Sequence, residues 1–157
     1  MHKKKIIIIF STICSFALFC GCIDMMTFSL KLNGEKKYKL TCDGNQIEFQ
    51  IKMNMGSNYR IFITPKSGAF DLYPDSLVIT LPPRYGMYSS KFIYEGKEVF
   101  NHQTVEKGKT LIWRFSVGGD FGAPNPDSSQ IFLIPPSNFI MCNDKPLITD
   151  TIRISLK

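Results

Sequence analysis

The stretch Ile47-Glu-Phe-Gln-Ile-Lys-Met53 decides the fold class. Its apolar residues alternate strictly with Glu, Gln and Lys. Successive side chains of a β-strand point to opposite faces, so this pattern predicts a strand with one buried side and one side in water. The same alternation recurs over Phe28–Leu32 and Thr110–Val117, where Trp113 shares the apolar face and is expected in the core. No window of sufficient length shows helical spacing, and the chain therefore reads as all-β.

Turn signals separate these strands. Asn33-Gly34 and Asp43-Gly44 are strong two-residue hairpin signals, and they predict a three-stranded meander from residue 28 to residue 53. About ten short strands with frequent turns favour an antiparallel β-sandwich, with an immunoglobulin-like arrangement as first choice and a jelly roll as second. The further strands are expected over residues 59–64, 77–81, 90–94, 99–105, 110–117, 130–134, 138–142 and 151–156.

The first 22 residues have the layout of a secretory signal. The cationic start His2-Lys-Lys-Lys5 precedes an apolar stretch over residues 6–19, and Gly21-Cys22 follows. The segment Leu18-Phe-Cys-Gly-Cys22 resembles the lipobox of bacterial lipoproteins. The resemblance implies cleavage after Gly21 and attachment of a diacylglyceryl group and an N-terminal acyl chain to Cys22. Two or more acyl chains hold a protein stably on a membrane, so Cys22 would be a durable anchor.

This interpretation divides the chain into a signal peptide (1–21), a short tether (22–27) and a β-sandwich domain (28–157). Two alternatives remain. The apolar stretch could stay as an uncleaved signal anchor, because Ile6–Ile23 is just long enough to span a bilayer. A conventional cut after Ala17 would release the domain. All three place the domain outside the cytoplasm, and the lipoprotein interpretation makes the membrane its partner through the lipid anchor on Cys22.

The five cysteines fall into two groups. Cys14 and Cys20 leave with the signal peptide, and Cys22 is assigned to lipid. Cys42 and Cys142 remain as an even pair in an oxidising compartment, where they can form a disulfide. Two separate buried thiols that act as small apolar side chains are the alternative.

The net charge argues against a nucleic-acid partner. The whole chain carries 19 Lys and Arg against 13 Asp and Glu, and removal of Lys3, Lys4 and Lys5 leaves 16 against 13, a net charge of +3. No basic stripe of the kind that binds nucleic acids is visible. The lysines at 36, 37 and 39 are interpreted as solvated charges of an edge strand, with a patch for anionic glycans or lipid head groups as the alternative.

Three stretches interrupt the strand pattern, at Pro65–Ser76, Pro82–Ser89 and Gly118–Ser129. Loops on a rigid β-scaffold commonly carry binding sites. Aromatic residues from two of these loops could form a platform for a sugar or a peptide, or could fold back over the ends of the sandwich. The candidate residues for ligand binding are Tyr85, Tyr88 and Phe121.

The search for catalytic chemistry is mostly negative. The sequence has no Gly-x-Ser-x-Gly motif and no phosphate-binding loop, and His102 is the only histidine after the signal peptide. We therefore predict no catalytic residue, no metal site and no cofactor. The expected function is a lipid-anchored binding or structural component of the envelope that recognises a glycan or an envelope protein. A carbohydrate-binding module and a small hydrolase are the alternatives; the hydrolase would use His102 or the carboxylate pairs Asp71/Asp75 or Glu95/Glu98.

Overall fold

A computed structural model of the chain describes residues 30–54, 58–119 and 132–156. Thirteen strands and one short 3₁₀ helix, η1 (Pro74–Ser76), make up the regular structure of these residues, which contain no α-helix. The strands are β1 (Leu30–Leu32), β2 (Lys37–Cys42), β3 (Asn45–Asn54), β4 (Asn58–Pro65), β5 (Phe70–Leu72), β6 (Tyr85–Tyr94), β7 (Lys97–Val99), β8 (Gln103–Val105), β9 (Leu111–Gly119), β10 (Phe132–Ile134), β11 (Ser137–Cys142), β12 (Lys145–Ile148) and β13 (Ile152–Leu156).

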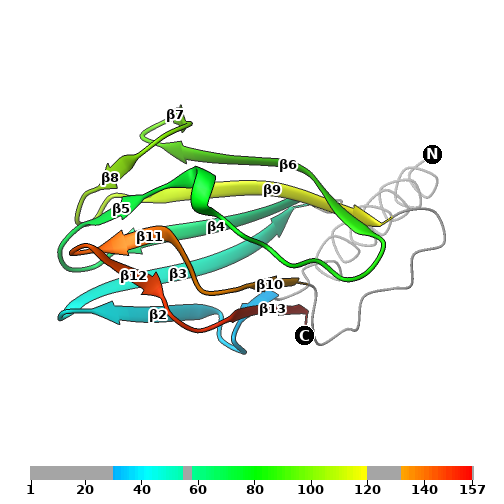
Figure 1. The fold of residues 1–157 in the computed structure, drawn as a ribbon, viewed down its shortest axis with the longest axis horizontal. Coiled ribbons are helices and arrows are strands. Elements are labelled where there is room, and N and C mark those ends of the chain that lie inside the picture. The colour runs from blue at the N-terminus through cyan, green and yellow to red at the C-terminus, as the bar shows by residue number, and fades with distance from the viewer. Residues whose placement is uncertain (1–29, 55–57, 120–131, 157) are drawn as a thin grey trace, which may run out of the picture.

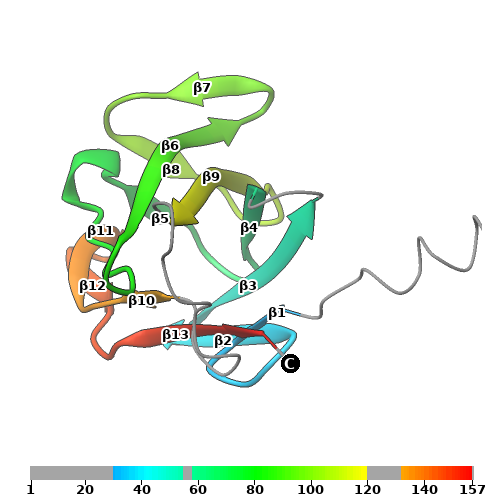
Figure 2. The ribbon, with the colours of Figure 1, turned by 90° about the vertical axis from the view of Figure 1, so that its right-hand side faces the viewer.

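The strands of the described residues form three sheets, in which neighbouring strands are antiparallel (Figure 1). The large sheet has six strands in the order β2-β3-β4-β9-β6-β7. A four-stranded sheet, β12-β11-β5-β8, and a three-stranded sheet, β1-β13-β10, lie opposite it. Figure 2 shows the large sheet bending around the interior that these smaller sheets close. The predicted antiparallel β-sandwich is therefore confirmed.

The core lies between the sheets and follows the period-two pattern. Along β9 every odd-numbered residue from 111 to 117 is buried, and the even-numbered ones are only partly buried. Trp113 is fully buried, as predicted, and its ring centroid lies 4.5 Å from that of Phe115 and 5.7 Å from that of Phe92. Its indole Nε1–H donates to the Ser90 hydroxyl at 2.9 Å. The aromatic side chains therefore fill the centre of the sandwich, and the indole N–H keeps a partner.

The turn chemistry forms as predicted, but one strand pairing does not. Asp43 and Gly44 both have positive φ, as a two-residue hairpin turn requires, and they connect β2 to β3. Asn33 and Gly34 also form a tight turn, in which Leu32 exchanges backbone hydrogen bonds with Glu35. β1 lies before that turn and is not paired with β2; it pairs with β13 instead. The predicted meander of residues 28–53 is therefore wrong, and β2-β3-β4 is the meander instead.

Three other expectations need correction. Residues 77–81 contain no strand and make only an isolated bridge between Thr80 and Leu133. Residues 99–105 contain two strands, the end of β7 and the whole of β8, because the chain bends between them. The expected loop 82–89 is largely the first half of β6. Two short strands were not predicted, β5 inside the expected loop 65–76 and β12, whose Pro146 obscures the strand pattern.

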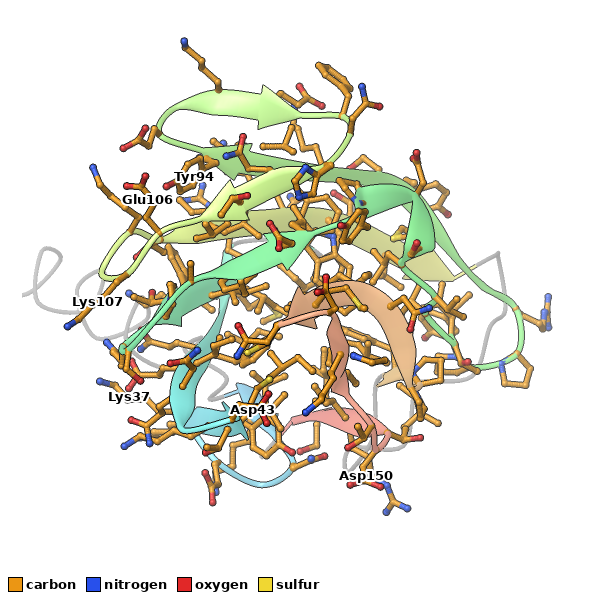
Figure 3. The ribbon with its side chains drawn as sticks, turned by 60° about the vertical axis from the view of Figure 1, so that its left-hand side comes forward. Lys37, Asp43, Tyr94, Glu106, Lys107 and Asp150 are labelled. Carbon is orange, nitrogen blue, oxygen red and sulfur yellow. The ribbon has the colours of Figure 1, made fainter. Side chains whose placement is uncertain are left out.

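The surface carries most of the charges, as the side-chain view shows (Figure 3). Strand β2 is the edge of the large sheet, and its Lys37 and Lys39 are exposed, as predicted for edge charges. Among the described residues, no helix is long and apolar enough to cross a membrane.

Candidate functional site

The outer face of the large sheet carries four cations in a line. The strand register places Lys52 of β3 opposite Arg60 of β4, Arg60 opposite Arg114 of β9, and Arg114 opposite Lys91 of β6. The chain neighbours of each cation belong to the inner face of the sheet, so the cation itself points outward. We call these four residues the cationic row.

The cationic row is not neutralised within the described part of the chain. None of its members forms an ion pair there, although five such pairs occur elsewhere. On β3 the acid of this face, Glu48, lies four residues from Lys52, or about 13 Å at 3.3 Å per residue. Its carboxylate is already 3.7 Å from the Lys37 ammonium and 3.4 Å from that of Lys66. Like charges on directly opposed residues destabilise a sheet, so this arrangement costs free energy unless an anion binds.

Arg114 adds a second sign of an absent partner. Its side chain is only partly exposed, and its Nε is buried without a hydrogen-bond acceptor among the described residues. A buried donor of a charged group that lacks an acceptor is uncommon, because leaving it unpaired is costly. An anionic oxygen placed against the guanidinium would satisfy this donor.

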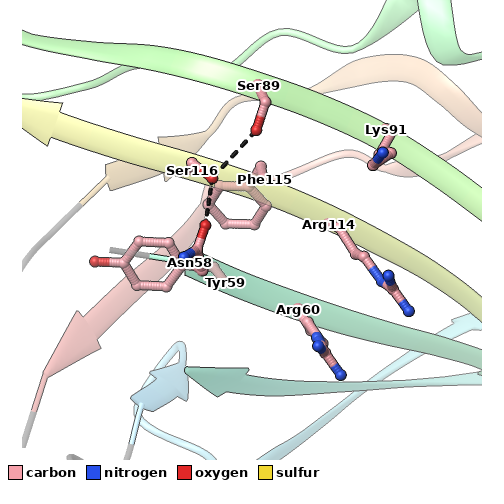
Figure 4. A pocket seen from close by; sticks show the side chains of 8 residues that line it. All are labelled: Asn58, Tyr59, Arg60, Ser89, Lys91, Arg114, Phe115 and Ser116. Atoms are coloured by element: carbon pink, nitrogen blue, oxygen red, sulfur yellow. Dashed lines mark hydrogen bonds between the residues drawn. The ribbon is translucent and has the colours of Figure 1, made fainter. Parts of the chain in front are cut away.

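A polar row borders the cations on the same face. The Ser89 hydroxyl donates to the Ser116 hydroxyl at 3.1 Å, and the Ser116 hydroxyl donates to the Asn58 amide oxygen at 2.5 Å. Together with Arg60, Lys91 and Arg114 these residues line an open depression of about 560 Å³ (Figure 4). The depression therefore offers guanidinium and ammonium donors beside hydroxyl and amide groups.

The other border of the cationic row is less polar. Phe62, Ile112 and Ile93 face each other in the next register row, and all three are half-buried. The Lys52 ammonium lies 5.2 Å from the centre of the Phe62 ring, in cation–π contact. The cationic row therefore has a polar border on one side and an apolar border on the other.

Of the predicted aromatic residues, Tyr85 and Tyr88 both lie on strand β6 and not in a loop. Tyr85 is half-buried and packs against the core. Tyr88 is 71% exposed and lies in a β-bulge between Met87 and Ser89, with its ring over Gly118. Phe121 lies outside the described residues, as do Gly21 and Cys22. The ligand-binding role of these tyrosines stays a prediction, but the structure separates their environments.

His102 forms a small exposed cluster of its own. Its Nε2 lies 2.9 Å from an Asp71 carboxylate oxygen, which also accepts from the Thr104 hydroxyl at 2.6 Å. The Tyr73 ring lies 4.9 Å from the imidazole. In this cluster the hydroxyl bonds to the carboxylate and not to the imidazole, which differs from the order nucleophile, base, acid of a hydrolase triad. Of the alternative carboxylates, Glu95 is bound by Lys109 at 2.7 Å.

Cys42 and Cys142 end strands β2 and β11 and lie next to each other. Both are buried free thiols, and the Cys42 Sγ lies 3.2 Å from the Cys142 carbonyl oxygen. The reciprocal distance, from the Cys142 Sγ to the Cys42 carbonyl oxygen, is 3.6 Å. Burial, the hydrogen bond between the thiols and the charge of the partner thiol raise the pKa of Cys42 to about 11. The predicted pair is thus brought together, and its oxidation to a disulfide stays a prediction.

Sequence inspection missed the cationic row for a definable reason. Each of its members sits in the polar phase of its own strand, where a single Lys or Arg is unremarkable. Their alignment depends on the pairing of β4 with β9 and of β9 with β6, strands that are far apart in the chain. A partial signal exists, since Arg60 directly follows the inward-facing Tyr59 and Arg114 lies between the inward-facing Trp113 and Phe115.

No family model, curated protein or solved structure matches this chain. The immunoglobulin-like and jelly-roll assignments therefore stay predictions beyond the antiparallel sandwich itself. Within residues 30–54, 58–119 and 132–156, no group of three or more His, Cys, Asp or Glu residues is placed to hold a metal ion.

Proposed function

We propose that this protein is a lipid-anchored binding module of the bacterial cell envelope, which binds an anionic ligand on the outer face of its large sheet. The cationic row is the single observation that supports the binding role. Four cations oppose one another across β3, β4, β9 and β6 without an acidic partner among the described residues. The strand register fixes the backbone positions of the four residues, so a ligand has only their side chains to order.

The envelope address rests on the signal-like leader and on the resemblance of residues 18–22 to a lipobox. Mass spectrometry of the protein from its own cells should find Cys22 as an acylated N-terminal residue. Replacement of Cys22 by Ser should move the protein out of the membrane fraction. An intact Met1, or an unmodified Cys22 thiol, would contradict the anchor.

Anion binding is tested with inorganic polyphosphate as the probe and the detergent-extracted protein in a titration calorimeter. The variant Arg60→Gln/Arg114→Gln should lose most of the binding, and binding by the unaltered protein should weaken as salt rises. The control Lys109→Gln/Lys145→Gln removes the same charge from two lysines that are ion-paired elsewhere on the surface, and it should bind normally. Equal losses in both variants would show net charge alone, and would contradict a site at the cationic row.

A further inference from the structure

We propose that the anionic ligand is an acidic oligosaccharide, with one sugar ring stacked on Tyr88 and its carboxylate or sulfate groups held by the cationic row. The inference rests on the proposed function and narrows its ligand to one chemical class. It joins two features of the outer face, an exposed aromatic ring and cations that have no acidic partner among the described residues, through the hydroxyl groups that lie between them.

Tyr88 is presented for stacking by the geometry of the strand. Met87 pairs with Val117 and Ser89 with Ser116, so Tyr88 is the extra residue of a β-bulge in β6. Its ring lies where a side chain of residue 118 would be, and glycine leaves that space free. Gly118 shares the phase of Arg114 and Ser116 along β9, which places the ring on the same outer face as the cationic row.

The remaining surface suits a sugar chain. Gly118 lies four positions after Arg114 on β9, or about 13 Å at 3.3 Å per residue. Ser116 lies between them, hydrogen-bonded to Ser89 and Asn58. A ligand that reaches from the ring to the guanidinium must therefore cross hydroxyl and amide groups. Sugar hydroxyls can bond to these groups, whereas a compact anion reaches only one end of the face.

An acidic peptide would use the cations but has no need of a bare aromatic face. Aromatic side chains supply large contact areas at low entropic cost, and a flat ring that is open to solvent matches the apolar face of a sugar. Phe100 offers a comparison with Tyr88. The two residues are similarly exposed, but Phe100 lies between β7 and β8, away from the cationic row.

The test compares hexagalacturonate with hexaglutamate that is acetylated at its N-terminus and amidated at its C-terminus, so that each probe carries six carboxylates, with and without sugar rings. In calorimetry on the detergent-extracted protein, we expect hexagalacturonate to bind at least about tenfold more tightly, as is common for a contact centred on an aromatic anchor. Tyr88→Ala should remove this difference and leave hexaglutamate binding unchanged. Tyr88→Phe should preserve it, and Phe100→Ala should have no effect.

A glycine pair provides a second, gentler test. Gly118→Ala places a methyl group against the Tyr88 ring and should displace it, so that hexagalacturonate binding weakens while the ring remains present. Gly86 is the register partner of Gly118 and has open space around it, so Gly86→Ala is the matched control. Circular dichroism and thermal unfolding report whether each variant is folded.

The outcomes separate the two proposals. Equal affinity for both probes, or an unaffected Tyr88→Ala variant, overturns the saccharide inference. If Arg60→Gln/Arg114→Gln still abolishes binding in that case, the anion site stands. If the double arginine variant binds both probes normally, the proposed function itself fails.

Discussion

Oxidation of Cys42 and Cys142 should change the stability of the domain by a large and measurable amount. The two residues are 100 positions apart in the chain, and their side chains are adjacent and buried. In the chain-entropy model, a bond that closes a loop of this length stabilises the fold by about 4.7 kcal/mol. For a domain of this size, that value corresponds to roughly 15 °C in melting temperature.

The assay is thermal unfolding of the purified protein with and without reductant, followed by circular dichroism. We expect the melting temperature to fall on reduction, and Cys42→Ala and Cys142→Ala to melt near the reduced protein under both conditions. Thiol titration of the denatured, unreduced protein should find neither Cys42 nor Cys142 reactive. Identical melting curves with and without reductant, together with two titratable thiols at these positions, would refute the predicted bond.

Three further predictions concern the thiol chemistry and the packing. In the reduced native protein, Cys42 should react with iodoacetamide slowly at pH 8 and about tenfold faster for each pH unit up to about pH 11. The reason is that only the thiolate is nucleophilic and burial raises the pKa of the Cys42 thiol. Mass spectrometry of the labelled protein measures the rate. Burial favours the neutral Cys42 thiol in the folded protein. The contribution of this thiol to the stability of the fold is therefore fully present below pH 9.0 and is lost as the pH rises through about 11. Ser90→Ala should lower the free energy of unfolding in urea by about 1–2 kcal/mol, because the buried indole N–H of Trp113 loses its acceptor. In a Trp113→Phe background, the same Ser90→Ala change should have little effect on the free energy of unfolding. Gly68→Ala should cost more in urea unfolding than Gly108→Ala, for which we expect roughly 1–2 kcal/mol, since both glycines have positive φ but only at Gly68 must a neighbouring side chain, Asn45, move aside; equal costs would contradict the steric argument.

The strand pattern predicted the sandwich well because each strand records its own buried face. β3 and β9 alternate without interruption, and both lie in the middle of the large sheet. Failures occurred where a segment is short or changes partner. β5 has three residues, too few for alternation to show, and β1 leaves its hairpin neighbour to pair with the far end of the chain. Local signals cannot report such a pairing, because its energy comes from contacts distant in sequence.

The candidate site was less predictable than the fold. Tyr88 was found from its residue type, but the stretch around it was expected to be a loop and is a strand. The bulge that turns Tyr88 over Gly118 depends on the register between β6 and β9. The cationic row depends on the same register, so neither feature can be read from one strand alone.

Core and candidate site are built from the same strand, and this links their geometry. On β9, Trp113 and Phe115 point into the core, while Arg114 and Ser116 point outward. A slip of one residue would send the cations inward and expose the aromatic rings, so the packing of Trp113 and Phe115 holds Arg114 opposite Arg60 and Lys91. Substitution of Phe115 should therefore weaken anion binding together with stability. Arg114→Gln removes no core contact and relieves the repulsion between opposed cations, so it should weaken binding without loss of stability, which separates a ligand site from a structural charge.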